Sequence, residues 1–282
     1  MLILLLCSLA AVGLAQAPAA KVPDNVEVDA NVAYAQYPET RVDVYRQKGA
    51  ANAKRPGVLL IHGGGWVNGT KEAMLANWVL PYLSKGFVVA NVEYRLAKAA
   101  KAPAAVEDVL AAGQWFLRNA AKYGVDRKRI VVSGGSAGGH LSLMVGLTPG
   151  SAKLGKPVPV AAVVNFYGIT DVGDQLSGTN MRKYAVEWLP EQNARYELAR
   201  RVSPMTYVRR KSPAVLTIHG DQDETVPYEH GVQLTKALRD AGADAEMITV
   251  EKGRHGFPAE KMKELYVDIF KFLERRGIKA AE

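Results

Sequence analysis

Hydrophobic residues follow two different patterns along this chain of 282 residues. Over 26–35 and 41–47, apolar and polar residues alternate, which is typical of two half-buried strands, antiparallel and at the edge of a sheet. Further along, short continuous apolar runs are typical of strands buried on both faces of a parallel sheet. These predicted strands lie at 57–65, 87–96, 129–135, 160–168, 214–220 and 244–253.

Segments with helical periodicity separate these runs. Their apolar residues recur at spacings of three and four, and several are followed by a glycine that predicts the end of the helix. The predicted helices lie at 72–86, 103–124, 136–147, 228–242 and 261–277. Strands that alternate with helices predict an α/β fold, doubly wound, with helices on both faces of a mostly parallel sheet. Ligands in such sheets bind beyond the carboxyl ends of the strands.

The first residues form a separate segment. The apolar run from Leu2 to Leu14 is shorter than the ~20 residues that span a bilayer and is typical of a secretory signal. We expect cleavage after Ala15 or Ala17, a secreted or periplasmic protein, and one domain over 16–282 with a small cap at about 168–212. Cys7 is the only cysteine, so the mature chain would contain neither a thiol nucleophile nor a disulfide.

Charge changes this picture little. The net charge is +8, and the basic residues concentrate between Met181 and Lys211, where eight Lys or Arg residues stand against three glutamates. A solvated face is the simplest interpretation, with attraction to an acidic surface or substrate as the alternative. No nucleic-acid-binding motif accompanies the charge, and no stable membrane anchor is predicted.

Two glycine clusters at strand ends suggest chemistry. Gly134, Ser136 and Gly138 form the pattern G-x-S-x-G between a strand and a helix, where a sharp turn exposes the serine. A serine hydroxyl needs a hydrogen-bonded base to act as a nucleophile. We therefore predict Ser136 as the nucleophile of an acyl-transfer enzyme.

A base and an acid follow in the order that this fold uses. His255 alone follows the last predicted strand in a short loop, so we predict it as the base. The loop after the preceding strand offers Asp221, Asp223 and Glu224 as the acid. The other histidines are interpreted as structural, with His230 expected at the surface of a helix.

The second cluster, HGGGW at 62–66, suggests how a negative oxygen is stabilised. Backbone N–H groups of Gly64, Gly65 and Ala137 are predicted to form an oxyanion hole. Losing one such donor typically costs about 2.7–4 kcal/mol, more than the roughly 0.5–1 kcal/mol by which a glycine weakens a strand or helix.

With these stretches, the chain resembles the α/β-hydrolase superfamily, and within it the carboxylesterases related to hormone-sensitive lipase and to the bacterial feruloyl esterase branch. The resemblance selects Asp223, the aspartate of HGxxDxxVP, and places the oxyanion donors at Gly64, Gly65 and Ala137. It also implies that His62, Glu93, Arg95 and Asp108 are structural supports. The matching stretches are IHGGGW, VEYRLA, PAAVEDVLAAGQWF, RIVVSGGSAGGHLSL, LTIHGDQDETVPYE and GRHGF.

Departures from the family pattern concern the surroundings of the serine. Many lipase-like members have aspartate where this chain has Gly135, and KAAKAP replaces the usual PEHPFP. A large amino-terminal cap is not expected, which would leave the site open to bulky esters. Tyr184, Trp188 and Tyr196 in the small cap are interpreted as packing residues.

The resulting expectation is a secreted serine carboxylesterase that acts on short-chain or aryl esters, either small molecules or groups linked to polysaccharide. It implies no metal and no organic cofactor. The alternatives are a feruloyl or acetylxylan esterase, a kynurenine-formamidase-like amidase, a small serine peptidase and a non-catalytic binding protein.

Overall fold

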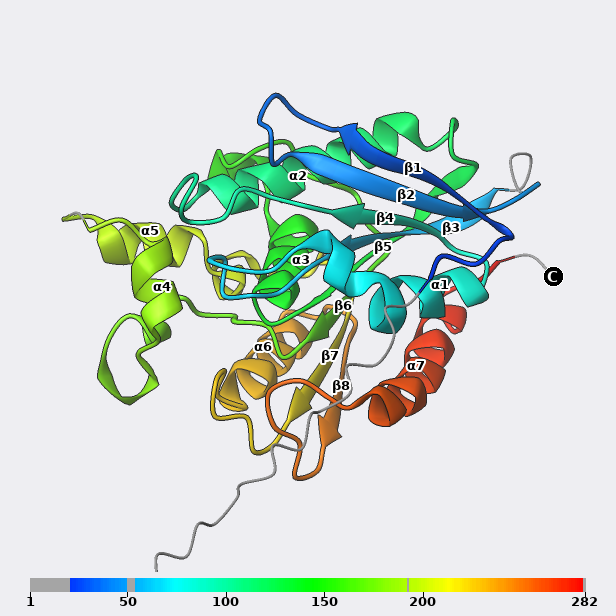
Figure 1. Cartoon of the computed structure of the whole chain (residues 1–282). Coiled ribbons are helices and arrows are strands. Elements are labelled where there is room, and N and C mark those ends of the chain that lie inside the picture. Colours follow the sequence, from blue (N-terminus) through cyan, green and yellow to red (C-terminus); the bar gives the residue numbers. More distant parts are fainter. Residues whose placement is uncertain (1–20, 50–53, 192, 281–282) are drawn as a thin grey trace, which may run out of the picture.

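One sheet of eight strands organises the residues that the computed structural model describes, 21–49, 54–191 and 193–280 (Figure 1). Its strand order is β1-β2-β4-β3-β5-β6-β7-β8; β2 runs antiparallel to both of its neighbours, β1 and β4, and the remaining neighbours are parallel. The predicted leader lies outside the described residues. The strands are β1 (Val26–Ala33), β2 (Arg41–Gln47), β3 (Arg55–Ile61), β4 (Val88–Val92), β5 (Val125–Gly135), β6 (Ala162–Phe166), β7 (Ala214–Gly220) and β8 (Ala245–Val250).

Helices pack on both faces of this sheet. The α-helices are α1 (Leu80–Ser84), α2 (Ala104–Asn119), α3 (Ala137–Leu147), α4 (Lys183–Trp188), α5 (Arg195–Arg201), α6 (Glu229–Asp240) and α7 (Ala259–Glu274). Short 3-10 or π turns are η1 (Lys71–Met74), η2 (Leu75–Val79), η3 (Gly150–Ala152), η4 (Gly173–Gln175), η5 (Gly178–Asn180) and η6 (Pro204–Tyr207). The doubly wound α/β prediction is therefore confirmed. The segment 168–212, predicted as a cap, holds η4, η5, α4, α5 and η6.

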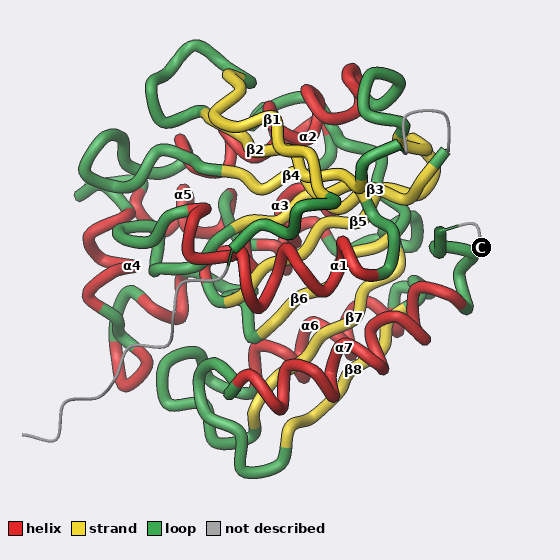
Figure 2. Tube along the Cα trace, turned by 45° about the vertical axis from the view of Figure 1, so that its right-hand side comes forward, coloured by secondary structure: helices red, strands yellow, loops and turns green. Residues whose placement is uncertain are grey.

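The core consists of two layers separated by the sheet. Alternate residues of β3 point to opposite sides: Leu59 and Ile61 pack with α2 and α3, whereas Val58 and Leu60 pack with α1 and α7. Figure 2 shows α1 and α7 together on the near side of the sheet. On the other side, α6 extends the layer of α2 and α3 through apolar contacts with α3 and β7. Burial of both faces explains why the central strands read as continuous apolar runs.

The sequence predicts one regular helix over 72–86, and this prediction is wrong. The structure divides this segment into a 3-10 turn, a π turn and the short helix α1. Pro81 has no N–H group, and its ring would clash with the carbonyl of Asn77 in a regular α-helix. The wider π turn over 75–79 removes that clash, and the Asn77 carbonyl accepts a hydrogen bond from Tyr266 instead (3.0 Å).

Both glycine clusters lie at the carboxyl edge of the sheet. The HGGGW stretch follows β3, Ser136 follows β5, and the loops that contain Asp223 and His255 follow β7 and β8. This is the edge at which open α/β sheets place ligand sites. None of the helices in the described residues combines the length and apolar content needed to cross a bilayer.

Candidate active site

Ser136 occupies a strained turn between β5 and α3. Its backbone has φ of 56° and ψ of −124°, outside the conformations that side-chain-bearing residues usually adopt. The neighbouring glycines make this turn possible. A Cβ at Gly134 would lie 2.3 Å from the carbonyl oxygen of Ile61, and one at Gly138 would lie 2.1 Å from the same atom. The Ser136 N–H donates to the carbonyl of Phe166 (2.9 Å), which fixes the turn against β6.

His255 connects Ser136 to Asp223. Its Nε2 lies 2.9 Å from Ser136 Oγ, and its Nδ1 lies 2.7 Å from Asp223 Oδ2. An ionised carboxylate only accepts hydrogen bonds, so Nδ1 carries the proton and Nε2 is left to accept from the serine hydroxyl. This arrangement can remove the proton from Ser136 and stabilise the imidazolium that forms.

The structure separates the three candidate acids. Asp223 is buried, and its Oδ1 accepts hydrogen bonds from the backbone N–H groups of Thr225 (2.8 Å) and Val226 (2.9 Å). Asp221 and Glu224 are exposed, and their side chains make no hydrogen bond to His255 in the described residues. Asp223 is therefore the carboxylate that orients His255.

Two histidines and the amides of the turn stabilise the ionised form of Asp223. Burial is the largest influence and by itself would raise the pKa of this carboxyl group. The contacts with His219 and His255, the charge of His255 and the Val226 amide outweigh burial, so the pKa of Asp223 lies well below its usual range. The carboxylate form of Asp223 is therefore favoured over the protonated form.

His219 is a site residue that sequence reasoning missed. It ends β7 and is fully buried, and its Nε2–H donates to the Val226 carbonyl (3.0 Å). Asp223 Oδ2 lies beside that bond, 3.3 Å from the same nitrogen. His219 thus contacts the turn that carries the acid at two points, the Asp223 carboxylate and the Val226 carbonyl. The available signal is the histidine directly before the GDQD sequence, at the end of a buried strand.

The three backbone N–H groups predicted to form an oxyanion hole are available to a ligand. In the described part of the chain, the N–H groups of Gly64, Gly65 and Ala137 donate to no protein acceptor. Gly64 and Gly65 have φ of 113° and 60°, a region that favours glycine. Tyr184 of α4 lies over Gly65, where a Cβ would come within 2.7 Å of the Tyr184 ring.

The residues assigned as supports form two hydrogen-bonded pairs behind these loops. His62 Nε2 lies 2.9 Å from Glu93, and its Nδ1 lies 2.7 Å from the carbonyl of Gly63. Arg95 binds Asp108 through Nε (2.8 Å) and Nη2 (2.7 Å). The first pair fixes the glycine loop after β3, and the second fixes the segment between β4 and α2.

Comparison with known proteins places this architecture in a family. The BD-FAE family model matches residues 42–238, a span that includes Ser136 and Asp223 and ends before His255. The chain belongs to the BD-FAE family. Esterase LipC of Mycobacterium tuberculosis is 32% identical over 240 residues, which are 80% of this chain and 59% of LipC. The BD-FAE chain spans about half to three fifths of the length of the curated relatives that it matches.

Solved structures share the fold. A truncated form of a carbohydrate esterase from gut microbiota is 28% identical, with a TM-score of 0.80 over 92% of this chain and 99% of that chain. The apo form of Thermogutta terrifontis esterase 2, 24% identical, has a TM-score of 0.75 over 92% of this chain and 97% of that chain. The second likeness concerns the fold alone.

The glycine before Ser136 in this BD-FAE protein has a packing reason. A Cβ at Gly135 would lie 3.0 Å from the ring of Trp78 and 3.0 Å from the hydroxyl of Tyr167. The Tyr167 ring in turn contacts His255 at 4.8 Å and Phe257 at 5.2 Å between ring centroids. An aspartate at 135 would displace this aromatic wall. Trp78 and Tyr167 were missed from the sequence because no local motif marks them.

Cap aromatics of the BD-FAE protein have different environments. Trp188 is fully buried and stacks on Trp66 at 4.1 Å, as the packing interpretation predicted. Tyr196 is 58% exposed, so the same interpretation is wrong there: its hydroxyl reaches Ser177, but its ring faces solvent. His140 of α3 joins the buried cluster, with its ring centroid 4.9 Å from that of Trp66 in an edge-to-face arrangement.

The expected surface position of His230 is also wrong. His230 is buried in the first turn of α6, where its Nδ1 accepts the backbone N–H of Thr170 (3.0 Å). Its Nε2 lies 3.2 Å from Asp174. The loop after β6 packs against this end of the helix, a contact between distant segments that helical periodicity alone does not predict.

Proposed function

We propose that this chain hydrolyses carboxylic esters through an acyl-enzyme on Ser136. The observation that carries the proposal is the hydrogen-bonded series Ser136, His255 and Asp223, with distances of 2.9 and 2.7 Å. Membership of the BD-FAE family and relatives named esterases support the same reaction class.

The geometry suggests how each step proceeds. Ser136 Oγ attacks the ester carbonyl carbon while its proton passes to His255 Nε2, and the N–H groups of Gly64, Gly65 and Ala137 receive the developing negative oxygen. His255 returns the proton to the departing alcohol. A water molecule then gives a proton to His255 and attacks the acyl carbon, and the carboxylic acid leaves as Ser136 regains its proton.

The substrate is proposed to be a short-chain or aryl ester, including esters linked to polysaccharide. The aromatic wall of Trp78 and Tyr167 beside the nucleophile favours a planar or compact acyl group. The likeness to a carbohydrate esterase supports a sugar-linked alcohol.

The first test compares wild type with Ser136→Ala on p-nitrophenyl acetate, butyrate and octanoate, methyl ferulate and acetylated xylan. Ser142→Ala is a matched control, since Ser142 lies on the same helix and donates only to the Gly138 carbonyl. We expect kcat to fall roughly 10⁴- to 10⁶-fold in Ser136→Ala alone. An organophosphate should label wild type stoichiometrically at Ser136. Turnover that survives in Ser136→Ala, or a folded wild type without turnover, would reject the proposal.

Export is proposed on the apolar segment 2–14. The intact mass of protein collected outside the cytoplasm should correspond to cleavage after Ala15 or Ala17. Protein that stays in the cytoplasm with its full amino terminus would contradict this.

A further inference from the structure

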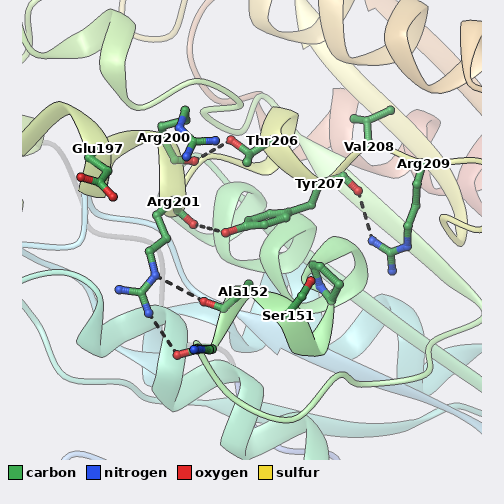
Figure 3. A pocket seen from close by; sticks show the side chains of 11 residues that line it. Ser151, Ala152, Glu197, Arg200, Arg201, Thr206, Tyr207, Val208 and Arg209 are labelled. Atoms are coloured by element: carbon green, nitrogen blue, oxygen red, sulfur yellow. Dashed lines mark hydrogen bonds between the residues drawn. The ribbon is translucent and has the colours of Figure 1, made fainter.

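A cavity of about 620 Å³ lies at the opposite end of α3 from Ser136 (Figure 3). It is lined by 149–153, which follow α3, and by α5, η6 and the residues just after η6. Since α3 has 11 residues and a helix rises about 1.5 Å per residue, roughly 16 Å of helix separate it from Ser136. Its volume is in the usual range of small-molecule sites, about 300–1,000 Å³. We call this cavity the distal basic pocket.

Positive charge dominates the lining. The lining contains a single carboxylate, that of Glu197, and four cations: Lys153, Arg200, Arg201 and Arg209. Across the described residues, none of these four cations lies within ion-pair distance of a carboxylate. The helix α7 is the opposite case, because each of its lysines has an acidic partner on the same helix.

Hydrogen bonds hold two of the guanidinium groups in place. Arg201 donates to the carbonyl oxygens of Ala152 (3.3 Å) and Lys153 (3.0 Å). Arg209 donates to the carbonyls of Leu147 and Tyr207. Figure 3 shows Arg201 and Arg209 on either side of the Tyr207 ring. Carbonyl oxygens carry only partial charge, so the formal positive charges remain uncompensated and fixed beside the cavity.

Helix capping explains part of this charge but not all of it. The carboxyl end of α3 carries about half a negative charge, which Arg209 satisfies through the Leu147 carbonyl. Four cations opposed by one carboxylate exceed that requirement. Arg200 is exposed, and its guanidinium donates no hydrogen bond to the described residues. The surplus charge is available to an anion from outside the chain.

We infer that the distal basic pocket binds the carboxylate of a uronate unit in an acidic polysaccharide, an inference that rests on the proposed ester hydrolase function. A planar guanidinium binds a carboxylate through two parallel hydrogen bonds, and the Tyr207 ring offers an apolar surface beside it. The cations line one pocket, whereas a nucleic acid needs them spread along a groove.

The test compares three ester substrates: acetylated xylan that carries uronate groups, the same polymer after its carboxyl groups are reduced to alcohols, and p-nitrophenyl acetate. Arg200→Glu reverses one pocket charge. Arg127→Glu is the matched control, since Arg127 is exposed on β5 and forms no ion pair in the described residues. We expect Arg200→Glu to raise KM roughly tenfold on the uronate polymer only, and Arg127→Glu to leave all three KM values unchanged. An unchanged KM in Arg200→Glu, or an equal rise in Arg127→Glu, overturns the inference.

Calorimetry on the Ser136→Ala protein separates this inference from the proposed function. A uronate oligosaccharide without esters should bind, and Arg200→Glu in the same background should weaken that binding about tenfold. If wild type hydrolyses no ester, the proposed function fails and this binding alone decides the pocket. Absence of oligosaccharide binding overturns the inference. So does binding of a DNA oligonucleotide in its place that Arg200→Glu removes, which would assign the pocket to phosphate polyanions.

Discussion

The two ends of α3 carry opposite kinds of site. At its amino end, Ser136, His255 and Asp223 meet within hydrogen-bond distance, and the acid is buried. At its carboxyl end, Arg200, exposed and without an ion pair in the described residues, lines an open pocket. The helix dipole favours this polarity, since negative charge is stabilised at the amino end and positive charge at the carboxyl end.

The difference between the two ends shows that burial determines how strictly the structure restricts the residue at each position. At the amino end, added atoms meet backbone at 2.1–2.3 Å, so even a methyl group at Gly134 or Gly138 is excluded. At the carboxyl end, the charges act partly through solvent, where single ion pairs contribute about 0–1 kcal/mol and are weakened by salt. Substitutions at the amino end should therefore change kcat strongly. Those at the carboxyl end should leave kcat unchanged and raise KM on a charged polymer by about tenfold or less, to an extent that depends on salt.

After Ser136→Ala, the largest predicted effect is that of Gly65→Ala. The new methyl group would lie 2.7 Å from the Tyr184 ring at a φ of 60°, so the Gly65 N–H must move away from the oxyanion position. We expect kcat on p-nitrophenyl acetate to fall about 10²- to 10³-fold. Gly277→Ala is the control: its φ is 70° and no atom lies within 4 Å, so it should cost stability without changing kcat. Equal kcat for Gly65→Ala and wild type would contradict an oxyanion role.

The burial of the amino end of α3 can be tested through the pH dependence of stability. Burial lowers the pKa of His140 to about 4, although its hydrogen bond to the Val202 carbonyl favours the charged form. An unfolded chain takes up this proton near pH 6.5, whereas the folded protein resists it until about pH 4. The stability that neutral His140 provides is therefore complete above pH 6.5 and decreases as the pH falls toward 4, by about 3 kcal/mol.

Denaturant titrations of wild type and His140→Gln at several pH values measure this term. Glutamine does not titrate, so the free energy of unfolding of the variant should decrease less between pH 6.5 and 4. Parallel curves for the two proteins would show that His140 does not contribute.

Sequence reasoning is most specific where the chemistry leaves a local pattern of residues. Ser136 lies in a glycine pattern required by close backbone contacts, and the candidate acid and base follow in a fixed order of strand ends. The structure brings Ser136, Asp223 and His255 together as that order predicts, and the strands were predictable because both faces of the sheet are buried.

Features that depend on packing between distant segments were not predictable. Trp78 reaches Gly135 only because the π turn before Pro81 reorients its segment, and hydrophobic periodicity predicted a regular helix there. His219 acts through a carbonyl seven residues away, and His230 is buried by the loop after β6. In these cases the sequence pattern is compatible with several side-chain environments, and tertiary contacts select one.

A smaller effect is predicted for His219. His219→Phe removes the donor to the Val226 carbonyl and the contact with Asp223, so the acid turn should hold His255 less firmly. We expect kcat to fall about tenfold with little change in KM, because small displacements of positioned groups are costly. His219→Gln retains a donor at a similar reach and should recover most of kcat. If the free energy of unfolding falls equally in both variants and kcat changes in neither, His219 contributes to packing and does not position His255.

The smallest predicted effect, that of Arg209→Gln, separates the two uses of charge at the carboxyl end. Glutamine can still donate to the Leu147 carbonyl but carries no charge. Loss of the favourable interaction with the helix dipole should lower the free energy of unfolding by about 0.3–1 kcal/mol, and kcat on p-nitrophenyl acetate should not change. If Arg209 also contributes to binding uronate, KM on the uronate polymer should rise about twofold to threefold at low salt and converge with wild type at high salt. A stability loss with an unchanged KM would make Arg209 a helix cap only, and would leave the attraction of an acidic polysaccharide to Lys153, Arg200 and Arg201.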